Sequence, residues 1–206
     1  MLTAREPNRR QWLAGPWSAL AGPLLGKAAW VTAAALLACL PAVAAIGRQE
    51  ALKAAYPGAE FEAERVFLSE EQQSRAARLA GVEVPSALIA RYLAHRKGRR
   101  VGRAYVDTHV VRTKKETLLI CLNPDGSVRR IETTAFLEPP EYEAPQEWRR
   151  QYRDRQLNDD LNLNRSIRPL AGATLTTRAV NEAVRRVLAI DQVLQADAKP
   201  AREGRP

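Results

Sequence analysis

A run of small and hydroxyl-bearing residues stands directly before a long segment with helical periodicity, and this junction constrains the fold more than any other feature. The run occupies residues 170–177 and reads Leu-Ala-Gly-Ala-Thr-Leu-Thr-Thr. The segment after it carries apolar residues at the spacing of one helix stripe: Val180, Ala183, Val184, Val187, Ile190 and Leu194. The run is therefore expected at a helix N-terminus, where unpaired backbone N–H groups and the helix dipole favour an anion such as a phosphate.

Two interpretations of this junction stay open on the local pattern. In the anion interpretation, Gly172 and Ala173 let the backbone approach the ligand closely. In the simpler interpretation, Thr174, Thr176 or Thr177 is an N-cap, whose side-chain oxygen accepts a hydrogen bond from a helix N–H group and contributes about 1 kcal/mol.

Length and charge exclude several classes of protein. A chain of 206 residues that is 46% hydrophobic can bury one domain of ordinary size plus a terminal segment. The net charge of +9 comes from scattered Lys and Arg without a zinc-finger, RNP-type or basic-zipper pattern, so we expect no nucleic-acid partner. The same charge suits anionic lipid or an acidic redox partner. Cys39 and Cys121 have no second Cys or His at ligand spacing, so no metal site is expected.

An apolar, uncharged stretch at residues 28–46 indicates export. The charged segment Arg48-Gln49-Glu50 ends it. Lys27 and the Arg9-Arg10 pair precede it, and this basic flank predicts that the N-terminus stays cytoplasmic while the rest of the chain crosses the membrane. The stretch is just long enough to span a bilayer, and Ala42-Val43-Ala44 resembles a signal-peptidase site. Residues 1–46 are thus expected to be a cleaved signal peptide or a retained hydrophobic anchor helix, and the localisation extracytoplasmic.

The remaining pattern predicts an α+β domain with a mainly antiparallel sheet and flanking helices, over residues 47–196, and a disordered tail over 197–206. The expected helices lie at 49–56, from the capping box Ser69–Gln72 to near Gly81, at 145–152, and after the hydroxyl run. The expected strands are two within 88–111 around a Lys97-Gly98 turn, and a hairpin of 117–122 and 127–136 around Asn123-Pro124-Asp125-Gly126. As an alternative to the first strand, residues 87–95 could also be helical.

The triplet Gly172-Ala173-Thr174, followed by Leu175 and Thr176, resembles the flavinylation motif of the FMN-binding domain family. That family includes the extracytoplasmic flavin subunits of the Rnf complex and of sodium-pumping NADH:quinone reductase, and small stand-alone periplasmic proteins. The layout from about Ala51 to Leu194 is similar to the small members. Segments that carry this similarity are Tyr105-Val106-Asp107-Thr108-His109, the 123–126 turn, and Phe136-Leu137-Glu138-Pro139-Pro140.

The resemblance implies a function and a set of binding residues. A separate flavin transferase would link the FMN phosphate to Thr174 as a phosphoester, with Arg178 and the helix N-terminus neutralising its charge. The loop around Glu138 would lie near the flavin ring, and His109 could contact the flavin or a proton path. The chain would then be an exported, membrane-associated electron carrier rather than a stand-alone catalyst, passing electrons between membrane or periplasmic partners.

Other possibilities remain beside this one. The family pattern has Ser or Thr before the Gly and an acidic residue three positions further upstream, where this chain has Ala171 and Arg168. A flavin-free accessory or assembly module of a membrane redox complex is therefore an alternative, and a secreted flavin reductase with dissociable FMN is another. For His109 a structural role is also open.

Overall fold

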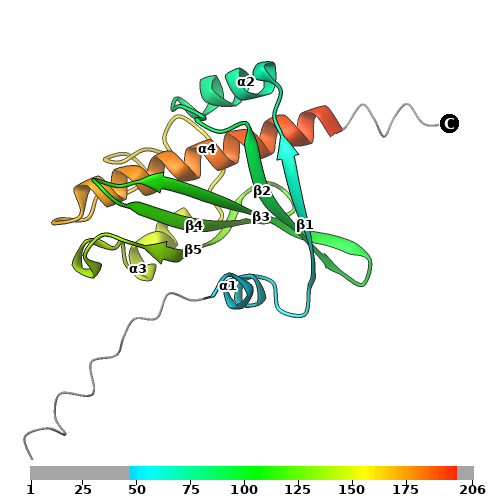
Figure 1. Ribbon diagram of the computed structural model, residues 1–206, viewed down its shortest axis with the longest axis horizontal. Coiled ribbons are helices and arrows are strands. Elements are labelled where there is room, and N and C mark those ends of the chain that lie inside the picture. Colours follow the sequence, from blue (N-terminus) through cyan, green and yellow to red (C-terminus); the bar gives the residue numbers. More distant parts are fainter. Residues whose placement is uncertain (1–46, 199–206) are drawn as a thin grey trace, which may run out of the picture. The chain divides into compact units, whose positions relative to one another are not determined.

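The computed structural model describes residues 47–198, and within them the chain forms one antiparallel sheet with helices on both faces (Figure 1). The signal or anchor expected at residues 1–46 lies outside the described residues and stays a prediction. The last helix continues to Ala198, two residues beyond the expected end of the domain at 196.

The five strands pair in chain order, each antiparallel to the next, which confirms the expected α+β class with a mainly antiparallel sheet. Short turns join the last four strands, as the Asn123–Ser127 turn does for the last hairpin, whereas residues 68–87, which include a helix, connect the first two. The strands are β1 (Glu60–Phe67), β2 (Leu88–Arg96), β3 (Arg99–Val110), β4 (Lys115–Leu122) and β5 (Val128–Phe136).

The two strands predicted within residues 88–111 around the Lys97-Gly98 turn are confirmed as β2 and β3, so the helical alternative for residues 87–95 is wrong. β1 was not predicted at all. It is an edge strand with mostly exposed side chains. Its glutamates at alternate positions lower its strand propensity, so the segment resembles a polar linker in sequence.

The helix α2 (Glu70–Ala80) begins and ends as the sequence predicts. Ser69 accepts a hydrogen bond from the backbone N–H of Gln72, and the Gln72 side chain accepts one from the backbone N–H of Ser69, which completes the capping box. Gly81 ends the helix at a φ of 66°, a left-handed conformation that glycine adopts without strain.

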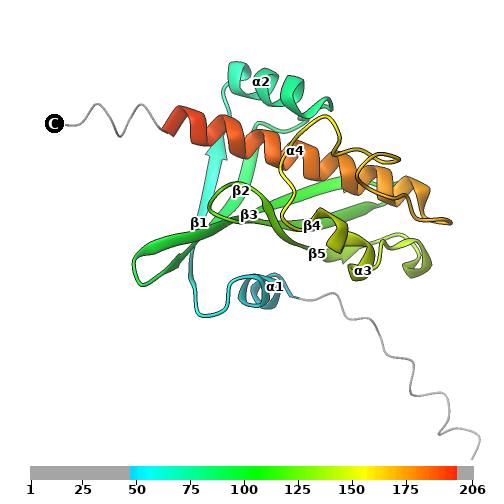
Figure 2. The same ribbon diagram turned by 180° about the vertical axis from the view of Figure 1, so that it is seen from behind.

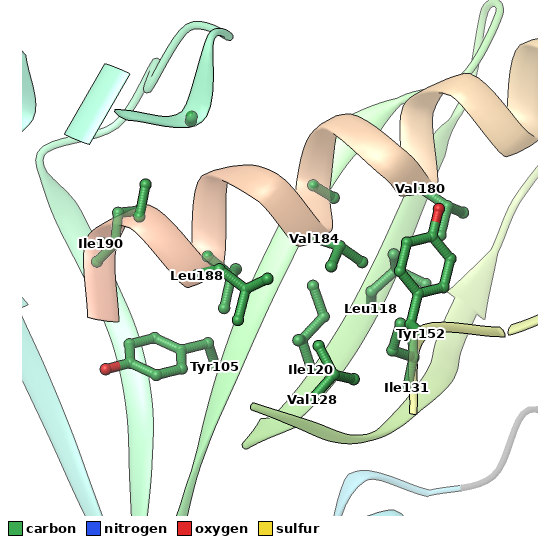
Figure 3. Packing of buried hydrophobic residues seen from close by; sticks show 14 of the residues in the cluster. Tyr105, Leu118, Ile120, Val128, Ile131, Tyr152, Val180, Val184, Leu188 and Ile190 are labelled. Atoms are coloured by element: carbon green, nitrogen blue, oxygen red, sulfur yellow. The ribbon is translucent and has the colours of Figure 1, made fainter. Parts of the chain in front are cut away.

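The main core lies between the sheet and the helix α4 (Thr174–Ala198), with α2 packed beside α4 on the same face (Figures 1 and 2). The apolar stripe predicted for this helix is the surface that it buries. Figure 3 shows Val180, Val184, Leu188 and Ile190 of the helix above Leu118 and Ile120 of β4 and Val128 and Ile131 of β5.

The short segment after β5 also packs against the main core. It contains the 3₁₀ turn Pro140–Tyr142 and then the helix α3 (Gln146–Arg149), which continues directly into the 3₁₀ turn Arg150–Tyr152, so the helix expected at 145–152 is present with a tightened last turn. Trp148 and Tyr152 pack edge to face with ring centroids 5.7 Å apart, and Tyr152 is fully buried.

The opposite face of the sheet carries the helix α1 (Arg48–Ala55) (Figures 1 and 2). Leu52 and Ala55 of α1 pack with Tyr56 on Ala104 and Cys121 of the sheet. The hydroxyl of Tyr56 lies 2.7 Å from the carbonyl oxygen of Arg103 and 2.9 Å from that of Leu122. Burial raises the pKa of the Cys121 thiol to about 12, so this thiol is inert at neutral pH.

A buried ion pair joins α4 to the centre of the sheet. Arg103 on β3 and Asp191 on α4 are 1% and 2% exposed, and their two contacts measure 2.5 Å from Nε to Oδ1 and 2.7 Å from Nη2 to Oδ2. The hydroxyl of Tyr105 donates a third hydrogen bond to Asp191 at 2.7 Å. The buried carboxylate therefore has hydrogen-bond donors on both oxygens, which is the condition under which a buried pair is tolerated.

Removing one partner of this pair should cost more than removing both. We expect Asp191→Leu to lower the free energy of unfolding by about 3–5 kcal/mol, because Arg103 keeps its charge and loses its counter-ion. The double variant Arg103→Met with Asp191→Leu should be more stable than Asp191→Leu alone. Denaturant unfolding measures both, and a double variant less stable than the single one would contradict this account.

Gly102 is required by the approach of Tyr56. A Cβ atom at position 102 would lie 2.3 Å from Cε1 of Tyr56 and 2.6 Å from the carbonyl oxygen of Leu122. We expect Gly102→Ala to lower the free energy of unfolding by about 1–3 kcal/mol through overpacking. Gly47→Ala is the control, because a Cβ there meets only Oε2 of Glu50, at 3.9 Å. Equal losses for the two variants would contradict the steric explanation.

Candidate functional site

The loop that leads into α4 is held by the segment around α3. Trp148 Nε1 donates to the carbonyl oxygen of Arg168 at 2.6 Å, and the backbone N–H of Arg168 donates to Gln151 Oε1 at 2.9 Å. Gly172 then turns the chain at a φ of 83°. A Cβ at Gly172 would meet no protein atom within 4 Å, so the positive φ is what favours glycine in the described chain. The close approach of this backbone to an anion stays a prediction.

The N-terminus of α4 has no side-chain cap. The helix starts at Thr174, so Ala173, which has no side-chain acceptor, takes the cap position. The Thr176 hydroxyl donates to the carbonyl oxygen of Tyr142 at 2.7 Å and the Thr177 hydroxyl to that of Thr174 at 3.1 Å. Thr174 is exposed and its hydroxyl bonds nothing within residues 47–198. The N-cap interpretation of the three threonines is therefore wrong.

Three backbone donors are left open by this arrangement. The first intrahelical bond runs from the N–H of Thr177 to the carbonyl oxygen of Ala173 at 2.9 Å. In the described part of the chain no acceptor faces the N–H groups of Thr174, Leu175 and Thr176. Such groups, together with the positive end of a 25-residue helix, attract an anion.

These donors border a half-open pocket of about 210 Å³. It is lined by the motif residues Gly172, Ala173, Thr174, Leu175 and Thr176, by Glu138 and Tyr142 after β5, and by Val111 and Arg112 after β3. The pocket combines apolar walls with one guanidinium and the helix N-terminus. It can take an amphipathic ligand that carries an anionic group.

Glu138 lines this pocket, as the sequence predicts, but its carboxylate is already engaged. Its Oε1 accepts hydrogen bonds from the backbone N–H groups of Thr113 and Lys114, at 2.7 and 2.8 Å, and from the Thr113 hydroxyl at 3.2 Å. The two backbone N–H groups hold the pKa of Glu138 below its usual value. Glu138 therefore positions the β3–β4 turn, which carries Val111 and Arg112 to the pocket.

Two expected site residues do not line the pocket. Arg178 is exposed one turn further along α4, without an ion pair in the described chain. His109 lies on β3 in an ionic cluster under α4. Its Nδ1 is 2.9 Å from Asp107 Oδ1, its Nε2 is 3.2 Å from Glu116 Oε2, and Arg186 of α4 holds both oxygens of Asp107.

This cluster keeps His109 protonated at neutral pH. Burial alone would lower the pKa of His109, but the hydrogen bonds and charges of Asp107 and Glu116 outweigh it and raise the pKa to about 9. With the imidazolium and Arg186 as the two cations, and Asp107 and Glu116 as the two anions, the cluster is neutral. Its contacts join α4 to β3 and β4, which is the structural role left open for His109.

Three pocket residues were missed by sequence reasoning. Val111 and Arg112 lie in a turn whose place depends on Glu138, which is 27 and 26 positions away from them in the sequence. Tyr142 reaches the pocket through the 3₁₀ turn Pro140–Tyr142, and its carbonyl oxygen accepts the Thr176 hydrogen bond. The adjacent Pro139-Pro140 was the one local signal of a turn at this point.

Comparisons with protein-family models, curated proteins and solved structures found no match to this chain. Within residues 47–198 no helix is long and apolar enough to cross a membrane, and no group of three His, Cys, Asp or Glu side chains could hold a metal ion.

The His109 cluster should make stability depend on pH. Because the pKa of His109 rises from 6.5 to about 9 on folding, its contribution is complete below pH 6.5, declines above it, and is lost above pH 9. We expect His109→Gln to be less stable than the wild type at pH 6, with a difference that shrinks by about 2–3 kcal/mol at pH 9.5. Urea unfolding at both pH values tests this, and a difference independent of pH would contradict it.

Proposed function

We propose that this chain is an exported FMN-binding electron-transfer protein whose FMN is attached through its phosphate to Thr174. The observation that carries the proposal is the N-terminus of α4, where an exposed threonine hydroxyl adjoins three unpaired backbone N–H groups at the edge of a pocket. The resemblance of Gly172–Thr176 to a flavinylation motif supplies the identity of the ligand.

The residues present fit the parts of FMN. The phosphate would lie at Thr174, within reach of the N–H groups of Leu175 and Thr176, where the helix dipole offsets its charge. Val111, Tyr142 and Leu175 offer apolar surface to the ring system, and Arg112 offers a donor at the rim. When bound, FMN supplies one-electron or two-electron redox chemistry. The protein contributes binding, orientation and the partner-facing surface.

Covalent attachment suits a protein outside the cytoplasm, because a dissociable cofactor would be lost there. Attachment also removes the entropic cost of recruiting FMN for each reaction. No acid–base or nucleophilic pair lies at the pocket among the described residues, and the Glu138 carboxylate is held by the β3–β4 turn. These features support a carrier rather than a stand-alone catalyst.

The alternative is a flavin-free accessory module with the same fold. Ala171 and Arg168 favour it, because they replace the hydroxyl and acidic residues of the family pattern. Arg168 is exposed, and the contacts that the structure gives it are made by its backbone. A transferase that reads the acidic position would therefore meet a cation there.

The test is flavin fluorescence after denaturing electrophoresis of the full chain co-expressed with a flavin transferase. We expect a fluorescent wild-type band, no fluorescence from Thr174→Ala, and fluorescence retained in Thr176→Val, which loses a neighbouring hydroxyl that is already bonded to Tyr142. A band that stays fluorescent in Thr174→Ala would overturn the attachment site.

A dark wild-type band would overturn covalent attachment. The absorbance of the native protein then separates the remaining possibilities. Flavin absorbance that is lost on denaturation would indicate a dissociable cofactor and a reductase, and no flavin absorbance would indicate the accessory module.

A further inference from the structure

The face of the sheet that carries α1 is only partly covered. Ala94, Ala104, Leu119 and Cys121 pack under α1. Because alternate residues of a strand share a face, Phe67, Leu88 and Val110 lie on this face as well, near the other end of the strands. They are 73%, 45% and 56% exposed. We call this set, with Arg65 and Lys115, the open α1 face.

The register of the strands supports the placement of these side chains. Phe67 is opposite Leu88, and Val110 is opposite Lys115. The hydroxyls of Thr108 and Thr117, on the same face, lie 3.0 Å apart. Exposed apolar side chains that gather on one sheet face are a usual mark of an interaction surface.

The charge of this face has one sign where it is exposed. Arg65 and Lys115 are exposed, and neither has an ion pair in the described chain. Glu132 on β5 is the acidic residue of this face among the described strands, and it is buried and paired with Arg130. Lys97 and Arg99 add exposed positive charge at the β2–β3 turn. Next to this turn, the Arg96 side chain donates a hydrogen bond to the carbonyl oxygen of Pro57, which follows α1.

The course of the chain points to the same face. The helix α1 starts at Arg48, two residues after Ile46, which ends the apolar stretch of residues 28–46. Only Gly47 separates the two. If residues 1–46 are retained as an anchor, the chain therefore enters the domain on the α1 face.

We propose that the open α1 face docks on the surface of an anionic lipid bilayer, with Phe67, Leu88 and Val110 at the headgroup boundary and Arg65 and Lys115 against lipid phosphates. An anionic bilayer binds surfaces that carry exposed apolar side chains next to basic ones. The free energy of burying apolar area and the attraction to anionic headgroups both favour such binding. The docking does not depend on whether FMN is bound.

The experiment compares two leucines of equal exposure. Leu88 on the open α1 face and Leu79 on α2, across the sheet, are each 45% exposed. Leu88→Cys or Leu79→Cys is placed in the full chain with Cys39→Ser, while Cys121 stays unlabelled because it is buried. An environment-sensitive fluorophore is attached, and the chain is reconstituted in phosphatidylglycerol-containing vesicles that carry a nitroxide lipid quencher.

We expect the quencher to act about threefold or more strongly on the label at position 88 than on the label at 79. The difference should fall in phosphatidylcholine vesicles and in the variant Arg65→Glu with Lys115→Glu. Equal quenching at the two positions would overturn the proposal. So would a label at 88 that is shielded from aqueous iodide without being quenched by lipid, because a protein partner or a second copy of the chain would then cover the face.

Discussion

The bidentate pair of Arg103 with Asp191 is the interaction on which the arrangement of this domain depends. It fixes a helix of 25 residues against the central strand of a five-stranded sheet through two buried side chains. The apolar stripe of α4 would pack on the sheet at more than one rotation or height. A planar guanidinium can bond both oxygens of one carboxylate at only one of these helix positions. The ion pair therefore selects one position of α4 among those that the apolar contacts alone would allow.

This register carries the candidate site with it. The pair lies toward the C-terminal end of α4, the Arg186–Asp107 contact lies in the middle, and the open N–H groups lie at the start. Because the helix is continuous, fixing its later turns also fixes the position of Thr174 relative to the β3–β4 turn. Contacts from elsewhere in the chain complete the pocket. Glu138 accepts hydrogen bonds from the β3–β4 turn, and the carbonyl oxygen of Tyr142 accepts one from the Thr176 hydroxyl.

Local sequence signals predicted the elements whose conformation they determine. The capping box at Ser69, the turn at Asn123–Gly126 and the stripe of α4 each act within a few residues, and each predicted its element. The strand β1 was missed because an exposed edge strand has little apolar alternation. Of the candidate site, the sequence predicted Glu138 and the Gly172–Thr176 run, whereas Arg112 and Tyr142 depend on contacts between distant segments. His109 and Arg178 were expected beside them, but side-chain partners and helix rotation place both elsewhere.

The β3–β4 turn connects the pocket with the open α1 face. Val110 and Val111 are neighbours in the chain, yet Val110 is exposed on the α1 face while Val111 lines the pocket. Val110 is the last residue of β3, and the chain turns at Val111, whose backbone N–H donates to the carbonyl oxygen of Lys114, so the two side chains serve different surfaces. A bilayer that receives Val110 would therefore hold the pocket at a fixed distance, on the far side of a single strand end. If the pocket holds FMN as proposed, this geometry would keep the cofactor near a membrane partner.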